Sequence, residues 1–300
     1  MFYPGLDWHL GKLVGRLYKI IYTMCMGFGC NAAGVVGCRI IDSPRERLIA
    51  ILTNSLIPCN GRFPALIILI TIFLSGSGNS LVSAGILAGF ILLAVAVTML
   101  ASKLLSSTVL KGERSSFTLE LPPFRRPKIA EVIVRSIFDR TLYILGRAVV
   151  AAAPAGLVIW LLANVQIGSA TVLQHLCMLL NPVGLLLGMN GVILLGFILG
   201  LPANELVVPV IIMCLTAGSL SGADASTAEV GRILLQNGWT IPMALCTMVF
   251  FLFHWPCSAT CLTIYKETRS VKWTVLAVLL PTVIGIVLCY VLNLVLHIVL

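Results

Sequence analysis

The sequence predicts an all-α, polytopic membrane protein in which some helices are broken or re-entrant. Of its 300 residues, 59% are hydrophobic and 10% are charged, whereas soluble proteins carry about 25% charged residues. The mean hydropathy is +1.06, and apolar runs recur at the length of about 20 residues that crosses a hydrocarbon core. Barrel strands instead alternate polar and apolar residues. A soluble enzyme, a disordered regulator, a disulfide-stapled secreted module and an outer-membrane barrel are therefore excluded.

The charge distribution predicts a cytoplasmic (inner) membrane protein. Twenty Lys and Arg residues outnumber eleven Asp and Glu residues, which gives a net charge of +9. The basic residues gather in blocks beside apolar runs, as the positive-inside rule describes, so we expect contact with membrane lipid and no nucleic-acid partner. The ten cysteines lie mostly in apolar stretches and lack the framing of a disulfide scaffold.

The chain divides into four predicted regions. Residues 1–24 form an amphipathic interfacial helix, and residues 25–105 contain a first broken segment and the span after it. Residues 106–140 form a basic cytoplasmic loop, and residues 141–300 contain further broken segments and the C-terminal spans. A chain of this length holds roughly six to eight spans.

Proline and polar residues interrupt several of these spans. Because proline removes a helix hydrogen bond and clashes with the preceding turn, the segment 47–74, which Pro58 and Pro64 interrupt, is expected to form two half-helices joined by unwound backbone. The predicted segments are 47–74 (broken at 58–64), 80–102, 142–163, 191–217 (broken at 200–205), 240–264 (broken at 254–257) and 273–299.

Positive-inside counting places 1–47, 103–147 and 266–272 in the cytoplasm. Three full crossings between residues 147 and 266 would instead put the loop 266–272 on the outside of the membrane. Either the segment broken at 200–205 is re-entrant, or 172–189 adds a crossing; we favour re-entrance.

A weak internal repeat accompanies the breaks. GCN (29–31) precedes an apolar run ending in PCNGR (58–62), and ANE (203–205) precedes one ending in PCSAT (256–260). Paired interruptions in two halves of a chain indicate a transporter site built from broken helices, so an inverted repeat is hypothesised.

Two thiols are the leading candidates for metal ligands, Cys59 and Cys257, because each follows a proline in a predicted break. Unwound backbone at membrane depth must line a cavity or be buried in protein, and thiolates select the softer transition metals. The alternative for each is an inert buried thiol. Cys30 is a weaker third candidate.

Glu205 and Asn31 complete the predicted ligand set. An ionisable side chain at membrane depth usually lines a pathway, although Glu205 is alternatively a structural partner of Arg62 or Arg147. Asn31 and Asn204 offer amide oxygens but alternatively cap half-helices. His254 is chemically able to bind a metal, and a structural role is favoured for it. Arg62 is expected to hydrogen-bond unwound carbonyls or to pair with Glu205.

No catalytic residues are predicted. The sequence contains no GxxxxGK[ST] phosphate loop, no HExxH motif and no nucleophile elbow. We therefore expect a protein that is not an enzyme and holds no permanent cofactor.

At these motifs the chain resembles the membrane domain of the bacterial ferrous iron transport protein B family. The matching segments are GFGCN (27–31), DSPRERLIAILTNSLIPCNGRFP (42–64), ELPPFRRP (120–127), NELVVP (204–209) and HWPCSATCLTIYKETRSVKW (254–273). The resemblance implies Fe(II) uptake across the cytoplasmic membrane between two gate regions, 25–105 and 141–300. It places Cys59 and Cys257 as the gate cysteines, Cys30 and Asn31 in the GCN element, and Glu205 as the membrane-embedded glutamate.

Family members normally begin with a GTPase domain, which this chain does not show. The resemblance therefore implies a separate GTPase-bearing subunit as a partner, beside Fe(II), membrane lipid and a possible second copy of the chain. Two alternatives stay open: a gate-type permease for another divalent metal or a nucleoside, and a non-transporting membrane assembly remnant.

Overall fold

The computed structural model describes residues 22–74, 80–108, 134, 143–168, 170–216 and 226–299. These residues are almost entirely helical, which confirms the predicted all-α membrane class. The predicted interfacial helix up to residue 21, the loop 75–79 and most of the basic loop 106–140 lie outside the described residues.

The first half of the chain contains a helical hairpin, a broken helix and a long helix. Residues 22–29 are helical and cross the predicted boundary after residue 24. They are followed by α2 (Asn31–Gly37), the 3-10 turn η1 (Cys38–Ile40), α3 (Pro44–Asn54), α4 (Phe63–Phe73) and α5 (Ser80–Ser107). The hydroxyl of Ser43 accepts a hydrogen bond from the Glu46 N–H and caps α3, as expected for serine before a helix that opens with proline.

The second half begins with a long helix that contains Pro154. It comprises α7 (Tyr143–Asn164), β1 (Gln166–Ile167), β2 (Ala170–Thr171), α8 (Val172–Leu186), α9 (Gly191–Leu199), η3 (Asn204–Leu206), α10 (Val207–Leu215), α11 (Thr227–Gln236), α12 (Ile241–Phe253), α13 (Ser258–Thr268) and α14 (Val271–Val299). The strands form an antiparallel pair in which Gln166 lies opposite Thr171. The side chains of Thr171, Asn190, Ser226 and Thr240 cap the helices that follow them.

In the described part of the chain, three segments are long and apolar enough to cross a membrane. They are Ser80–Ser107, Ile241–Thr268 and Val271–Ile298, and α8 with α9 makes a fourth if that pair, bent by 107°, counts as one span. This number is smaller than the six to eight spans expected from the sequence, because several apolar segments are divided into helices too short to cross a membrane alone. One example is α3 with α4, which form a pair of half-helices because the chain between them is unwound from Ser55 to Arg62.

The segment broken at 200–205 folds back on itself. Gly196 packs against Ile211, and Gly200 packs against Val207, so closely that a Cβ atom at either glycine would collide. The contact nearer the turn, between Gly200 and Val207, joins residues that are closer in sequence than the contact between Gly196 and Ile211. The helices α9 and α10 therefore run antiparallel. This hairpin is the re-entrant geometry favoured from the charge pattern.

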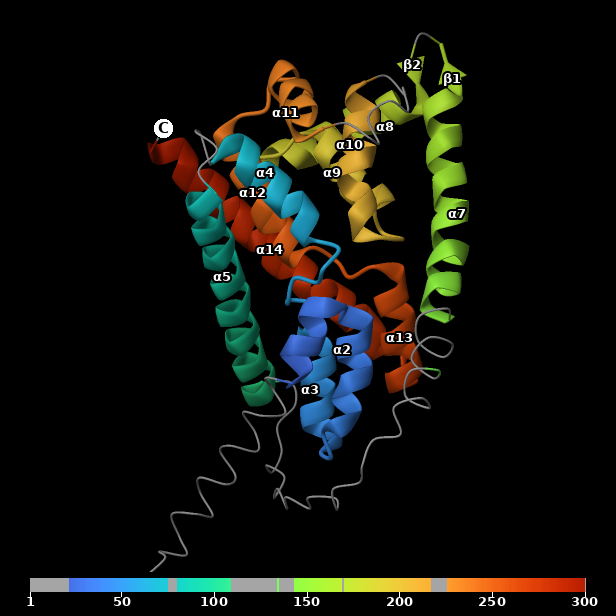
Figure 1. Ribbon diagram of the computed structural model, residues 1–300, viewed down its shortest axis with the longest axis vertical. Helices are drawn as coiled ribbons and strands as arrows, with labels where there is room; N and C mark the ends of the chain where they lie inside the picture. The colour runs from blue at the N-terminus through green and yellow to red at the C-terminus, as the bar shows by residue number, and fades with distance from the viewer. Residues whose placement is uncertain are drawn as a thin grey trace, which may run out of the picture.

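The position of α13 agrees with that geometry, because the chain comes back to the end of the molecule from which α3 starts. An ion pair joins Arg39 to Glu267, so the C-terminal end of α13 lies at the same end of the molecule as α2 and α3 (Figure 1). Seven described basic residues belong to this end: Arg39, Arg45, Arg47, Lys103, Lys266, Arg269 and Lys272.

The two halves are arranged as an inverted repeat. Each consists of a helical hairpin, a broken helix and a long helix: residues 22–37, α3–α4 and α5 in one, and α9–α10, α12–α13 and α14 in the other. The first hairpin enters from the end that carries α3, and the second enters from the opposite end (Figure 1). The backbone at the two tips is nearly the same, with φ −156° and ψ 125° at Cys30 and φ −150° and ψ 127° at Ala203.

The main core lies between α4, α5, α9, α10, α12 and α14. It is built around buried phenylalanines, among them Phe197, Phe250, Phe251 and Phe253. Large apolar side chains cover the outer faces of the long helices instead, including Leu92 and Leu100 of α5 and Ile298 of α14. Such all-apolar exposed faces are expected where helices contact lipid.

Candidate functional site

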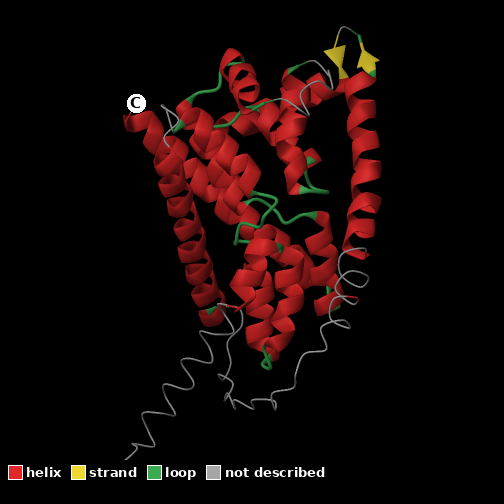
Figure 2. Ribbon diagram, in the orientation of Figure 1, coloured by secondary structure: helices red, strands yellow, loops and turns green. Residues whose placement is uncertain are grey.

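The unwound segments of both repeats meet at mid-height in the molecule. Figure 2 shows their loops gathered between the helices of the two ends. The backbone N–H of Asn60 donates to the Gly29 carbonyl at 3.4 Å, and that of Ser258 donates to the Leu201 carbonyl at 2.9 Å. Both donors directly follow a Pro-Cys pair. Each hairpin tip is therefore tied in the same way to the Pro-Cys break of its own repeat.

Asn204, at the tip of the second hairpin, connects the two repeats. Its side-chain nitrogen donates to Cys59 Sγ at 3.8 Å, and its side-chain oxygen lies 3.2 Å from His254 Nε2. All three residues are buried. Asn204 is the first residue of η3, whose N-cap is Ala203, and its amide contacts a candidate metal ligand.

The structure gives His254 a structural environment, as favoured from the sequence. Its Nδ1 atom lies 3.0 Å from the Phe251 carbonyl oxygen, and with the Asn204 contact both ring nitrogens have partners. The ring packs among the side chains of Phe197, Phe250, Phe251 and Trp255. This histidine orients Asn204 rather than facing an open cavity.

Arg62 joins the C-terminal ends of both broken helices. Its guanidinium donates to the carbonyl of Ser55, which ends α3, and to the carbonyl of Leu252 in the last turn of α12. It also donates to the carbonyls of His254 and Trp255. A cation is favourable at helix C-termini, where carbonyls are left without helical partners. Of the two roles predicted for Arg62, the structure shows the binding of unwound carbonyls.

The two candidate thiols share the neighbourhood of Arg62. Cys59 and Cys257 both lie near its guanidinium. Cys257 occupies the position before the first residue of α13, and its Sγ atom lies 3.2 Å from Thr260 Oγ1. Cys59 is buried, and Cys257 is half-buried.

The other predicted ligands lie around this centre. Glu205 is exposed and packs its side chain against Gly61. Cys30 is exposed at the tip of the first hairpin. Asn31 is buried; its amide nitrogen donates to the carbonyls of Gly27 and Ile57, each at 3.2 Å. Asn31 therefore fastens the first hairpin to the break after α3.

Within the described ranges, no three side chains among His, Cys, Asp and Glu lie close enough to hold a metal ion. The structure brings Cys59 and Cys257 to Arg62 and places Glu205 on the neighbouring loop, while Cys30 and Asn31 belong to the other tip. The full ligand set stays a prediction.

Replacing Asn204 with leucine is expected to free Cys59. The substitution keeps the side-chain volume similar but leaves His254 Nε2 and Cys59 Sγ without their shared partner, at a cost of about 1–3 kcal/mol. We expect a lower thermal midpoint and faster alkylation of Cys59, measured by peptide mass spectrometry. A Ser107→Ala variant, at an exposed position of α5, serves as the control; unchanged alkylation in Asn204→Leu would contradict the assigned contact.

The architecture resembles that of one class of membrane protein. Two re-entrant hairpins and two broken helices, repeated with inverted topology around unwound segments at mid-depth, are the arrangement found in secondary membrane transporters.

Comparison with known proteins makes this class more specific. Residues 87–139 match the family model described as the C terminus of ferrous iron transport protein B. The chain is 31% identical over 284 residues to the Fe(2+) transporter FeoB of Staphylococcus aureus (strain MSSA476), a match that covers 91% of this chain and 40% of the relative. No solved structure matches the chain.

Two further relatives cover similar shares. The FeoB transporter of Leptospira interrogans is 25% identical over 293 residues, or 89% of this chain and 41% of the relative. A Porphyromonas gingivalis protein named as a fusion of Fe(2+) transport protein A with FeoB is 23% identical over 308 residues, or 87% and 36%. The chain thus spans about two-fifths of the length of these curated relatives, and the resemblance predicted from its motifs is confirmed.

Proposed function

We propose that the chain is the membrane-embedded part of an Fe(II) transporter, in which the ion passes between the two broken-helix regions. One observation carries the proposal: the two Pro-Cys breaks, far apart in the sequence, meet at mid-depth beside Arg62, with Cys59 held by Asn204. The curated relatives, named as Fe(2+) transporters, support the choice of ion.

The chemistry of the centre suits a cation of intermediate softness. Thiolate sulfur favours soft transition metals, whereas amide, hydroxyl and carboxylate oxygens favour harder ions. Cys59 and Cys257 supply the sulfur, and Asn204, Thr260 and Glu205 supply oxygens nearby. The guanidinium of Arg62 is buried beside this centre.

A nucleoside substrate is less well supported. The aromatic rings near the centre, Phe197, Phe250 and Phe251, are buried and packed around His254. These three rings therefore offer no open face on which a base could stack.

The membrane orientation follows from charge. The seven basic residues at the end of α3, α5 and α13 face the cytoplasm under the positive-inside rule. We propose the cytoplasmic membrane as its location, with the first hairpin entering from the cytoplasmic side and α9–α10 from the outside. Fe(II) then moves from the α9–α10 side towards the α3 side.

Substitution of either gate thiol tests this function. In membrane vesicles that contain the full chain, Cys59→Ser and Cys257→Ser are each expected to lower Fe(II) uptake by at least about tenfold, because hydroxyl oxygen is a poor substitute for thiolate sulfur. Protein levels are measured in parallel. Cys25→Ser, at an exposed thiol of the first hairpin, is expected to leave uptake unchanged.

Competition with Mn(II), Zn(II) and nucleosides in the same assay identifies the substrate. If Cys59→Ser and Cys257→Ser both keep full Fe(II) uptake, the thiols have no part in the mechanism and the proposal is refuted.

A GTPase-bearing subunit supplied in trans completes the proposed transporter. It is expected to co-purify with the full chain from native membranes under mild detergent, and its consistent absence from such preparations would contradict this part of the proposal.

A further inference from the structure

A cavity of about 220 Å³ lies between the first hairpin, α3 and α5. Its length follows the two helices: from Glu46 to Asn54 on α3 and from Thr98 to Ser106 on α5, nine residues each, which span about 12 Å. At its inner end lies Ile57, two residues before Cys59. At its outer end lie Glu46 and Ser106, on the end of the molecule that carries the basic residues.

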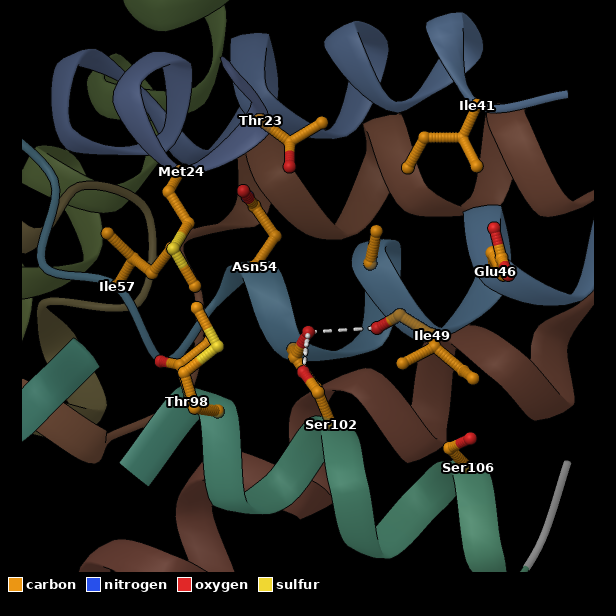
Figure 3. Close-up of a pocket in the computed structure, with 13 residues that line it drawn as sticks. Thr23, Met24, Ile41, Glu46, Ile49, Asn54, Ile57, Thr98, Ser102 and Ser106 are labelled. Atoms are coloured by element: carbon orange, nitrogen blue, oxygen red, sulfur yellow. Dashed lines mark hydrogen bonds between the residues drawn. The ribbon is translucent and has the colours of Figure 1, made fainter. Parts of the chain in front are cut away.

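Polar side chains line the cavity from both helices (Figure 3). They are Glu46, Thr53, Asn54, Thr98, Ser102 and Ser106. The hydroxyls of α5 recur every four residues and therefore share one face of an otherwise apolar span. Thr53, Asn54 and Thr98 are buried. Polar groups are costly at membrane depth and usually mark a pathway.

The hydrogen bonds of these hydroxyls determine which charge the cavity favours. Thr98 Oγ1 donates to the Ala94 carbonyl at 2.7 Å. Ser102 Oγ donates to Thr53 Oγ1 at 3.2 Å, and Thr53 Oγ1 donates to the Ile49 carbonyl at 2.9 Å. The hydroxyl hydrogens of Thr53, Thr98 and Ser102 are thus used inside the protein, so these three groups offer an occupant only oxygen lone pairs. Within a lining that is otherwise largely apolar, these three groups favour a cation.

We propose that this cavity is the inner half of the ion pathway, in which a partly hydrated divalent cation passes from the thiol centre along Thr98 and Ser102 to Glu46. The inference rests on the proposed transport function and extends it to residues outside the two breaks. The cavity has room for several water molecules, so an ion that leaves sulfur regains oxygen ligands before it reaches the cytoplasm. Weak, successive oxygen sites let an ion leave as well as enter.

Arg45 lies at the outer end of this pathway. Its guanidinium donates to the carbonyl and the hydroxyl of Ser106, at 2.8 and 2.9 Å. It thus connects the start of α3 to the end of α5 across the mouth of the cavity and forms its boundary there.

Filling the cavity is the first test. Ser102→Phe is expected to lower Fe(II) uptake by the full chain in vesicles at least about tenfold, because a close-packed side chain leaves no room for a hydrated ion. Ser107→Phe places the same substitution on the exposed face of α5 and is expected to leave uptake unchanged. Equal uptake by Ser102→Phe and the unsubstituted chain overturns the proposal.

Chemical labelling is the second test and uses a smaller substitution. In Ser102→Cys, a charged methanethiosulfonate reagent applied from the basic end is expected to modify position 102, as located by peptide mass spectrometry. Mn(II) is expected to slow this reaction at least about threefold, because the ion occupies the same oxygen-lined space. Labelling of Ser107→Cys is expected to be insensitive to Mn(II). If a lipid-soluble maleimide labels position 102 and the charged methanethiosulfonate reagent does not, the proposal is overturned.

The labelling is repeated in a Cys59→Ser background. Protection of position 102 by Mn(II) is expected to persist there, because the cavity has its own oxygen ligands. The two hypotheses can therefore be refuted independently. Loss of Mn(II) protection at position 102 refutes the cavity pathway, and full Fe(II) uptake by the serine variants refutes the role of the thiols.

Discussion

Replacing Arg62 with methionine is expected to prevent stable assembly of the two repeats. The substitution leaves four carbonyls near the centre without their donor, those of Ser55, Leu252, His254 and Trp255. Each unsatisfied buried acceptor costs about 1–3 kcal/mol, and the sum is comparable to the entire stability of a typical domain, about 5–15 kcal/mol. We expect little monodisperse protein in size-exclusion chromatography and a strongly lowered thermal midpoint.

Two variants make this result specific. Arg62→Lys is expected to fail as well, because a single ammonium group cannot replace a planar fork that reaches both helix ends. Arg39→Met removes an exposed arginine that pairs with Glu267 and is expected to change stability by at most about 1 kcal/mol. A normal thermal midpoint in Arg62→Lys would falsify the forked arrangement.

The second large effect is expected for Gly191→Ala, at the start of α9. A Cβ atom there would run into the carbonyl oxygen of Cys177 and the backbone of Asn181. These atoms belong to α8 and cannot move independently, so the substitution forces α8 and α9 apart at their 107° bend. The Gly191 N–H bond to Asn181 Oδ1, at 3.1 Å, is lost with it.

The expected cost of Gly191→Ala is about 1–3 kcal/mol, together with a large loss of Fe(II) uptake, because the bend aims the hairpin tip at Cys59. Gly89→Ala is the matched control: no atom lies within 4 Å of the added methyl group, and alanine favours the helix by up to about 1 kcal/mol. Gly89→Ala is expected to keep both stability and uptake, and equal behaviour of the two variants would contradict the close approach of α8 and α9.

The positions of the helix breaks were predictable from the sequence because their cause is local. Prolines end helices through their own ring and missing N–H, and the breaks after α3 and α12 fall at Pro58 and Pro256 as expected. The re-entrant segment α9–α10 was also predicted from the sequence. The basic loops 103–147 and 266–272 are expected on the same side of the membrane, which three full crossings between them would not allow.

The bend between α8 and α9 was not predicted, although signals for it exist. Gly188 adopts a positive φ of 70°, which favours glycine, and Asn190 caps α9. These residues lie between the predicted segments 172–189 and 191–217, but nothing local in the sequence gives the angle between the two helices.

The contacts of Asn204 and the cavity along α5 were beyond sequence reasoning. The partners of Asn204 lie 145 and 50 residues away, and nothing local specifies them. The matching positions of Asn31 and Asn204 in GCN and ANE pointed to a shared role at the tips. The four-residue spacing of Thr98, Ser102 and Ser106 was visible, but only the facing side chains of α3 show that it lines a cavity.

The two hairpin tips are held by different kinds of contact. The Asn60 N–H reaches the Gly29 carbonyl only at 3.4 Å, beyond the usual range for an N–H···O bond, so the first tip depends on a side chain: Asn54 Nδ2 donates to the Asn31 carbonyl at 2.8 Å. The second tip is held by the backbone, where the Ser258 N–H reaches the Leu201 carbonyl at 2.9 Å, and Ser258 Oγ adds a bond to the Pro202 carbonyl. Substitution of Asn54 therefore loosens the first tip, whereas only proline at position 258 removes the backbone bond of the second.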